Sequence, residues 1–207
     1  MTDPRPIAGE PAKVSDELED WSQEAGKRTL GSLIERFSEK SFALLFILLL
    51  GVPALPLPTG GATHVLELIA ALLALQLIVG RRTIWLPQRW RRLELAGAGR
   101  RRFIARLLKT IRWLERYSRP RLHGLFGHRA SNSVFGLMIL TCCAGAFLAP
   151  PFTGLDTLPA LGAVLISLGV LLEDVLFVAA GTAIAAGGIV LEIVLGKAVF
   201  DAARNLL

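Results

Sequence analysis

The sequence predicts an all-α integral membrane protein, and three observations lead to this class. The 207 residues are 53% hydrophobic and 19% charged, whereas an average soluble domain is about 45–50% apolar and about 25% charged. The apolar residues lie in five blocks, at 42–57, 65–80, 134–149, 158–172 and 175–195. The charged residues gather before and between these blocks. Together these features argue against a soluble enzyme, a disulfide-stapled secreted domain and a disordered chain.

Residues 1–41 are polar and acidic, with 6 Lys/Arg against 9 Asp/Glu. We expect a disordered tail over 1–14, which contains three prolines, and surface helices over 15–41. Ser15 precedes acidic residues that favour a helix start, and Ser32 with Glu35 predicts a capping box for a second helix. This segment does not read as a signal peptide, so we expect the first apolar block to act as the insertion signal.

Residues 42–80 and 134–172 each predict a helical hairpin with two short apolar arms. An arm of 16 residues gives about 24 Å of helix, which is less than the hydrocarbon core of about 30 Å. Pro56 and Pro150 break the helix before each hairpin tip. Each tip is either an exposed loop or a re-entrant turn inside the bilayer, and the short arms favour re-entrance.

The hairpins also show a repeat. A shift of 94 positions aligns Gly51 with Gly145, Pro56 with Pro150, Thr59 with Thr153, Gly60 with Gly154, and Thr63 with Thr157. These identities fall at break residues rather than at interchangeable leucines. They predict two copies of one unit, a construction that many membrane carriers use; the alternative is chance alignment of apolar sequence.

Residues 81–130 form a basic segment with 15 Lys/Arg against 2 Glu. A basic segment between apolar blocks predicts a cytoplasmic or interfacial location. Apolar residues at helical spacing predict a basic amphipathic helix, with Arg102, Arg106, Lys109 and Arg112 facing the anionic inner leaflet. A helix packed on a protein core is the alternative. The flanking membrane-grade sequence argues against nucleic acid as a partner.

The block at 175–195 is long enough to cross a bilayer, so it predicts a C-terminal transmembrane helix. Its small residues, including Gly181, Gly187 and Gly188, provide a face for close helix packing. We treat that face as a candidate contact in a homodimer.

The hairpin tips, which we call the corners (residues 56–64 and 150–157), are the candidate binding site. The predicted substrate-binding residues are Thr59, Gly60, Thr63, His64, Thr153, Gly154, Asp156 and Thr157. Thr63 and Thr157 are expected N-caps, and helix N-termini beside glycine present N–H groups that suit an anion or a phosphate. The alternative is that these residues only cap helices and permit tight turns.

Elsewhere the sequence offers little catalytic chemistry. The three histidines are not at metal-ligand spacing, and Cys142 and Cys143 are expected to be buried small hydrophobes. We therefore expect no catalytic residues, no metal, no cofactor and no enzymatic activity. Glu67 and Gln76 are polar groups inside apolar blocks, and ionisable residues there are functional candidates.

Glu173 and Asp174 lie between the last two apolar blocks. We expect them at the membrane interface, paired with arginines of the basic segment.

Five sequence motifs are unusual in combination. They are T-L-G-S-L at 29–33, P-A-L-P-L-P-T-G-G at 53–61, L-Q-L-I-V-G-R-R-T-I-W-L-P at 75–87, P-P-F-T-G-L-D-T-L-P-A-L at 150–161 and L-L-E-D at 171–174. Over roughly residues 28–195 the chain resembles the ExoD family of bacterial membrane proteins associated with exopolysaccharide synthesis. The resemblance implies a multi-pass protein of the bacterial inner membrane and supplies no catalytic residues. Val175 stands where the resemblance leads us to expect a glycine.

Two functions fit these features. The first is a carrier or flippase-like protein that binds an anionic species, such as a lipid-linked polysaccharide precursor, at the paired corners. The second is a non-transporting scaffold that organises polysaccharide assembly at the membrane. A membrane enzyme has the least support, because no nucleophile or acid–base pair stands out.

Overall fold

The computed structural model describes residues 14–23, 29–37, 40–55, 62–81, 83–92, 105, 108–113, 129–149 and 154–206. Regular structure in these residues is helical, which confirms the all-α prediction for the described part of the chain. The helices are α1 (Val14–Gln23), α2 (Leu30–Phe37), α3 (Ser41–Leu50), α4 (Ala62–Ile78), α5 (Gln88–Arg91), α7 (Arg129–Leu148), α8 (Thr157–Leu171) and α9 (Val175–Leu206). The predicted break residues Pro56 and Pro150 lie outside the described residues.

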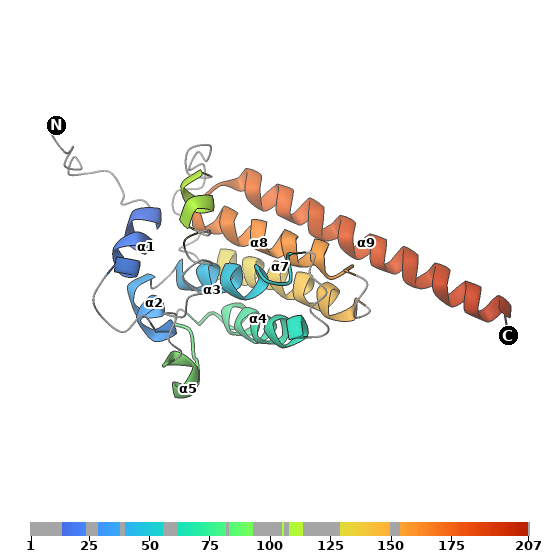
Figure 1. The fold of residues 1–207 in the computed structure, drawn as a ribbon, viewed down its shortest axis with the longest axis horizontal. Helices are drawn as coiled ribbons and strands as arrows, with labels where there is room; N and C mark the ends of the chain where they lie inside the picture. Colours follow the sequence, from blue (N-terminus) through green and yellow to red (C-terminus); the bar gives the residue numbers. More distant parts are fainter. Residues whose placement is uncertain are drawn as a thin grey trace.

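Five apolar helices run roughly parallel to the long axis of the molecule and form a bundle (Figure 1). The helix α8 packs on α9 and α3, α4 packs on α7, and each hairpin's own arms also touch. The small helices α1, α2 and α5 gather at one end, which we call the cap end. At the opposite end, the corner end, α9 extends beyond the other helices. The helices α4 and α8 run back toward the cap end, opposite in direction to α3 and α7 (Figure 1).

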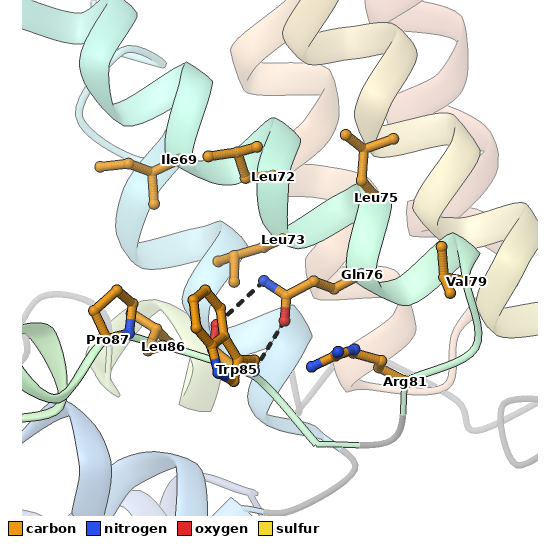
Figure 2. A pocket seen from close by; sticks show the side chains of 10 residues that line it. All are labelled: Ile69, Leu72, Leu73, Leu75, Gln76, Val79, Arg81, Trp85, Leu86 and Pro87. Carbon is orange, nitrogen blue, oxygen red and sulfur yellow. Dashed lines mark hydrogen bonds between the residues drawn. The ribbon is translucent and has the colours of Figure 1, made fainter.

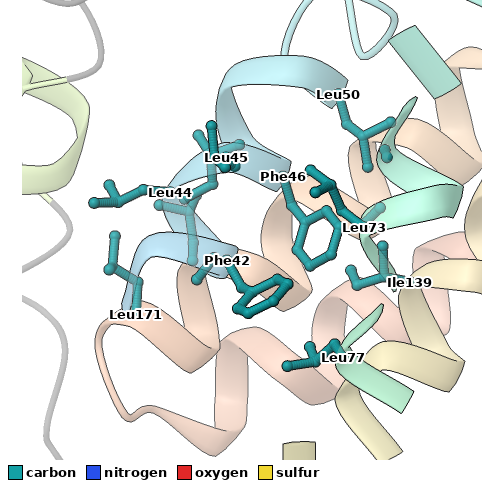
Figure 3. Close-up of a cluster of buried hydrophobic side chains, with 14 of the residues drawn as sticks. Phe42, Leu44, Leu45, Phe46, Leu50, Leu73, Leu77, Ile139 and Leu171 are labelled. Atoms are coloured by element: carbon teal, nitrogen blue, oxygen red, sulfur yellow. The ribbon is translucent and has the colours of Figure 1, made fainter. Parts of the chain in front are cut away.

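The bundle core is built from the inner faces of α3, α4, α7 and α8 (Figure 3). Phe46 is fully buried and meets Phe135 edge to face, with ring centroids 5.6 Å apart. Leu73, Ile139 and Leu171 complete the contact between hairpins. For helices that lie in a bilayer, close van der Waals packing of these side chains, rather than their removal from water, stabilises the arrangement.

The two return arms, α4 and α8, end in the same way. After α4 the N–H of Arg81 donates to the carbonyl of Gln76 (3.1 Å), and after α8 the N–H of Asp174 donates to the carbonyl of Gly169 (2.8 Å). Each is the long hydrogen bond of a Schellman cap, which requires a left-handed residue just before it. Gly80 (φ 82°) and Glu173 (φ 55°) occupy those positions. The repeat stays a prediction. Two copies of one unit would end in the same type of cap, as α4 and α8 do.

The helix α9 crosses α8 at very short range. A Cβ added at Gly181 would lie 2.7 Å from the carbonyl oxygen of Gly162, and one at Gly188 would lie 2.7 Å from Leu158. Gly181 and Gly188 therefore allow α9 to pack closely on α8 within one chain. They are not free to form the dimer contact that the sequence analysis considered for them. Gly187 has no atom within 4 Å of its added Cβ. Dimerisation through the outer face of α9 stays a prediction.

The helix α2 begins earlier than the sequence analysis expected. Thr29 Oγ1 accepts a hydrogen bond from the Ser32 N–H (3.2 Å), and Ser32 Oγ accepts one from the Thr29 N–H (3.2 Å). This reciprocal pair is the capping box. The predicted start at Ser32 was wrong because Thr29, three residues upstream, holds the N-cap position.

The cap end joins the acidic N-terminal helices to the basic segment. Arg91 pairs with Glu35 (2.7 Å), and Arg112 pairs with Glu19 of α1. Ile111, in the helical stretch 108–113, is fully buried, whereas Lys109 is exposed. This short helix packs on protein through Ile111, which corresponds to the alternative reading of the basic segment. Contact of Lys109 and Arg112 with lipid stays a prediction, and Arg102 and Arg106 lie outside the described residues.

Glu173 contacts a lysine at the turn between α8 and α9, and its expected pairing with arginines of the basic segment stays a prediction. Its Oε1 lies 3.9 Å from Nζ of Lys40, which precedes α3. Asp174 Oδ1 accepts a hydrogen bond from the Leu176 N–H (2.9 Å) and so caps the N-terminus of α9. The two carboxylates therefore hold the turn between α8 and α9.

Candidate functional site

The predicted corner residues that the structure describes lie at one end of the bundle, where α4 and α8 begin. Thr63 and His64 belong to the first turn of α4, and Asp156 and Thr157 mark the start of α8. The fold thus brings the two predicted corners to the same end (Figure 1). Thr59, Gly60 and Thr153 lie outside the described residues.

The predicted N-caps were wrong. Thr63 is the second residue of α4 and is buried. Thr157 is already helical, and Asp156 holds the N-cap position without a side-chain hydrogen bond to the helix. Asp156 has helical backbone angles (φ −58°, ψ −24°), whereas side-chain capping requires an extended N-cap residue. Gly154, with φ +70°, makes the turn instead.

A histidine–carboxylate pair forms the centre of the corner end. His64 Nδ1 lies 2.9 Å from Oε2 of Glu67, one helical turn along α4. The Glu67 side chain is fully buried, while 24% of the His64 side chain is exposed. Phe147 covers His64, with ring centroids 5.3 Å apart. The histidine therefore connects a buried carboxyl group to the outside.

The second oxygen of Glu67 has no partner. Among the described residues Glu67 Oε1 is buried and makes no hydrogen bond, and Glu192 Oε1 of α9 is in the same condition. A buried carboxylate is costly unless it is paired, hydrogen-bonded or neutralised by a proton. One hydrogen bond to His64 satisfies only half of the Glu67 carboxyl group. The unpartnered oxygen is thus available to a ligand or a proton.

Two further carboxyl groups lie near this pair. Asp156 is close enough to both Glu67 and Glu192 for their charges to interact. The charge of Glu67 also interacts electrostatically with the Cys143 thiol. The corner end therefore gathers three acidic side chains, from α4, α9 and the turn before α8. The anion site that the sequence analysis expected at these helix N-termini stays a prediction. While these groups carry charge they repel an anion.

The cluster does not have metal-site geometry. Within the described residues no three His, Cys, Asp or Glu side chains are placed to hold a metal ion. Cys142 and Cys143 are buried free thiols, as the sequence predicts. A proton is the ligand that such a cluster handles best, because carboxyl groups close together in a low-dielectric site share protons.

The sequence analysis named Glu67 as a functional candidate without placing it among the corner residues, and it did not include Glu192. Glu67 had a readable signal, because it follows His64 by three positions and so shares its helix face. Glu192 is an ionisable residue inside an apolar block, but its approach to Asp156 depends on how α9 packs against the hairpins.

The motif L-Q-L-I-V-G-R-R-T-I-W-L-P also has a structural basis, at the cap end. The Gln76 side chain accepts a hydrogen bond from the Trp85 N–H (2.9 Å) and donates one to the Trp85 carbonyl (3.2 Å). Gly80 supplies the left-handed turn after α4, and Ile84 and Leu86 are buried. The motif therefore folds the chain back along α4.

These observations define a class of protein. Ala130–Leu148 in α7 and Val175–Ala198 in α9 are long and apolar enough to cross a membrane. Many of the large apolar side chains of α9 are exposed, such as Leu176, Val190 and Ile193. A helical bundle with an apolar outer surface and buried carboxyl groups is typical of helical membrane proteins.

Comparison with known proteins identifies the family within this class. Residues 14–194 match the family described as "Exopolysaccharide synthesis, ExoD". The chain belongs to the ExoD family, as the sequence motifs led us to expect.

Two curated relatives extend this result. Protein ExoD of Rhizobium meliloti (strain 1021) is 32% identical over 182 residues, which cover 86% of this chain and 74% of the relative. An uncharacterised protein of Synechocystis sp. (strain PCC 6803) is 25% identical over 173 residues, which cover 82% of this chain and 81% of the relative. No solved structure is significantly similar to the chain.

Proposed function

We propose that this chain is a carrier-like, multi-pass protein of the bacterial inner membrane that serves exopolysaccharide synthesis and exchanges a proton at the His64–Glu67 pair. The observation that carries the proposal is the fully buried Glu67 carboxyl group, which has one oxygen on His64 and the other unpartnered. His64 is partly exposed and gives the proton a route to the outside. The ExoD family description supports the link to exopolysaccharide.

The position of the cluster along α9 supports a site within the bilayer. Glu192 lies 17 positions after Val175, which corresponds to about 25 Å of helix. If the cap end lies at one interface, the cluster lies near the far side of a hydrocarbon core about 30 Å thick. This depth supports re-entrant corners. The basic segment at the cap end supports a cytoplasmic location for that end under the positive-inside rule.

The substrate that we propose is an anionic species, with a lipid-linked phosphate as the leading candidate. Its phosphate would approach the N-terminal turn of α8, where Gly154 permits close contact with the backbone. Binding there requires that Glu67 and Glu192 first take up protons, because their buried carboxylates otherwise repel the phosphate. Proton uptake and anion binding are therefore coupled in this proposal.

The alternative is a non-transporting scaffold, and the cap end supports it. There α1, α2 and α5 lie together, held to the basic segment by ion pairs, and offer a charged surface to other proteins. In a scaffold the corner cluster would matter only for folding.

Exopolysaccharide output, normalised to membrane-inserted protein, separates the two functions. Glu67→Gln keeps the size of the side chain and removes its titration, so we expect output to fall at least tenfold. The matched control is Asp201→Asn, the same change at an exposed site on α9, and it should leave output unchanged. Normal output from well-inserted Glu67→Gln would overturn the carrier proposal and favour the scaffold.

A further inference from the structure

An apolar groove lies at the cap end, far from the carboxyl cluster. It runs between α4 and the extended segment 83–87 and has a volume of about 620 Å³ (Figure 2). Its size falls within the about 300–1,000 Å³ that is typical of small-molecule sites. The walls are formed by Leu72, Leu73, Trp85 and Leu86, and Gln76 and Arg81 are its polar residues.

The groove is held open by the backbone rather than by loose packing. Both polar atoms of the Gln76 amide bind the main chain of Trp85, at 2.9 and 3.2 Å, and so fix segment 83–87 beside α4. Leu72, Trp85 and Val79 around the groove are 54%, 64% and 80% exposed. Large apolar side chains exposed together mark a surface that binds an apolar partner.

Arg81 supplies the only cationic side chain among the residues that line the groove. It is exposed and follows α4 directly, and within the described part of the chain it forms no ion pair. Figure 2 shows its side chain on the Gln76 and Val79 side of the groove, with Trp85 between it and Pro87. The groove therefore offers one positive charge at one end and hydrocarbon along the rest.

We propose that this groove binds one anionic membrane phospholipid, with its phosphate on Arg81 and an acyl chain along Leu72 and Leu73. A single charge beside a long apolar surface matches an amphiphile. A peptide fits less well, because its backbone N–H and C=O groups need partners in an apolar site, and the Gln76 amide is already bound to Trp85. Trp85 is exposed beside the groove, and indole rings favour the membrane interface.

Fluorescence quenching by brominated lipid tests this site directly, because Trp85 lines it. The full chain is placed in phosphatidylcholine vesicles containing equal fractions of either dibromo-phosphatidylglycerol or dibromo-phosphatidylcholine. We expect the anionic lipid to quench at least twofold more of the fluorescence than the neutral lipid does. Trp85→Phe should abolish that excess, because Trp85 is the tryptophan among the described residues that line the groove.

Charge variants distinguish recognition of the lipid headgroup from binding of the acyl chain. Arg81→Gln should remove the preference for phosphatidylglycerol while quenching by both lipids persists. Arg204→Gln, which removes one exposed charge near the C-terminal end of α9, far from the groove, should keep the preference. Circular dichroism establishes that each variant has native helix content, and native mass spectrometry of the purified chain counts retained phosphatidylglycerol as a second measurement.

Three results would overturn the proposal. The first is equal quenching of the native chain by the two lipids. The second is an Arg81→Gln variant that keeps the preference and still retains phosphatidylglycerol. The third is efficient cross-linking of two Leu72→Cys chains in vesicles, which would show a second copy of the chain over the groove. None of these results bears on the proton exchange proposed for Glu67.

Discussion

The Gln76 amide hydrogen-bonds both the N–H and the carbonyl of Trp85. This side chain of α4 thus pairs with the main chain of segment 83–87 as a neighbouring strand would. The pairing joins two residues of the motif at 75–87, which is one of the motifs that carry the family resemblance. It also explains why a polar residue stands in an otherwise apolar helix. The Trp85 backbone would be left without these partners if Gln76 were apolar.

Gln76→Leu should therefore destabilise the fold by about 1–3 kcal/mol, since it removes two hydrogen bonds of about 0.5–1.5 kcal/mol each. The free energy of unfolding in detergent measures the loss. Gln88→Leu is the matched control, because Gln88 is exposed on α5 and should change stability by less than about 0.5 kcal/mol. Equal stability of the native chain and Gln76→Leu would show that the two bonds are not formed in solution.

The left-handed residues after α4 and α8 predict opposite effects of two substitutions on the free energy of unfolding. Glu173 adopts φ 55°, which costs a residue with a Cβ about 1–2 kcal/mol relative to glycine. Glu173→Gly should stabilise the chain by about 1 kcal/mol, even though it loses the 3.9 Å contact with Lys40. Gly80→Ala should destabilise it by a similar amount, because Gly80 has φ 82°.

Glu173→Gln is the control for charge, because it keeps the strained backbone and removes the ion pair. It should be close to neutral in the same unfolding measurement. If Glu173→Gly were less stable than Glu173→Gln, the left-handed turn after α8 would be wrong.

The crossing of α8 and α9 predicts a strong contrast between two glycines of one helix. Gly181→Ala places a Cβ 2.7 Å from the Gly162 carbonyl oxygen and should cost roughly 1–3 kcal/mol through overpacking. Gly187→Ala meets no atom within 4 Å and should gain about 0.5–1 kcal/mol from helix propensity. Similar melting temperatures for the two variants would contradict close packing of α9 on α8.

The ion pair between Arg112 and Glu19 predicts that Lys109 and Arg112 contribute unequally to lipid binding. Lys109 is exposed, and Lys109→Gln should weaken binding to anionic vesicles by about 1 kcal/mol. Arg112 is already paired with Glu19, so Arg112→Gln should have a smaller effect. Vesicle flotation at low and high salt measures both, and the Lys109 effect should shrink at high salt. A larger loss in Arg112→Gln would indicate that lipid displaces Glu19.

The broad architecture could be predicted from the sequence because it depends on local signals. Apolar blocks broken by proline define the hairpins, and α9 covers the predicted block at 175–195. Helix starts were less predictable, as Thr29 and Asp156 show, because Ser, Thr and Asp cluster at each start and only the backbone angles decide between them. Even so, the turn at Gly154 has the positive φ expected of a corner glycine.

The character of the site could not be predicted in the same way. Helix N-termini suggested an anion, since the acidic side chains stand far apart in the sequence. Asp156 and Glu192 approach Glu67 only after α8 and α9 pack on the first hairpin. The sign of the charge at the corner end is thus a property of the tertiary structure.

The central claim is that Glu67 exchanges a proton at the corner end, and infrared difference spectroscopy of the purified chain measures this directly. Spectra recorded between acid and alkaline pH should contain a protonated-carboxyl band that disappears as pH rises. The band should be missing in Glu67→Gln and retained in Asp201→Asn, in which an exposed carboxyl group of α9 is removed. A Glu67→Gln spectrum identical to that of the native chain would contradict the claim.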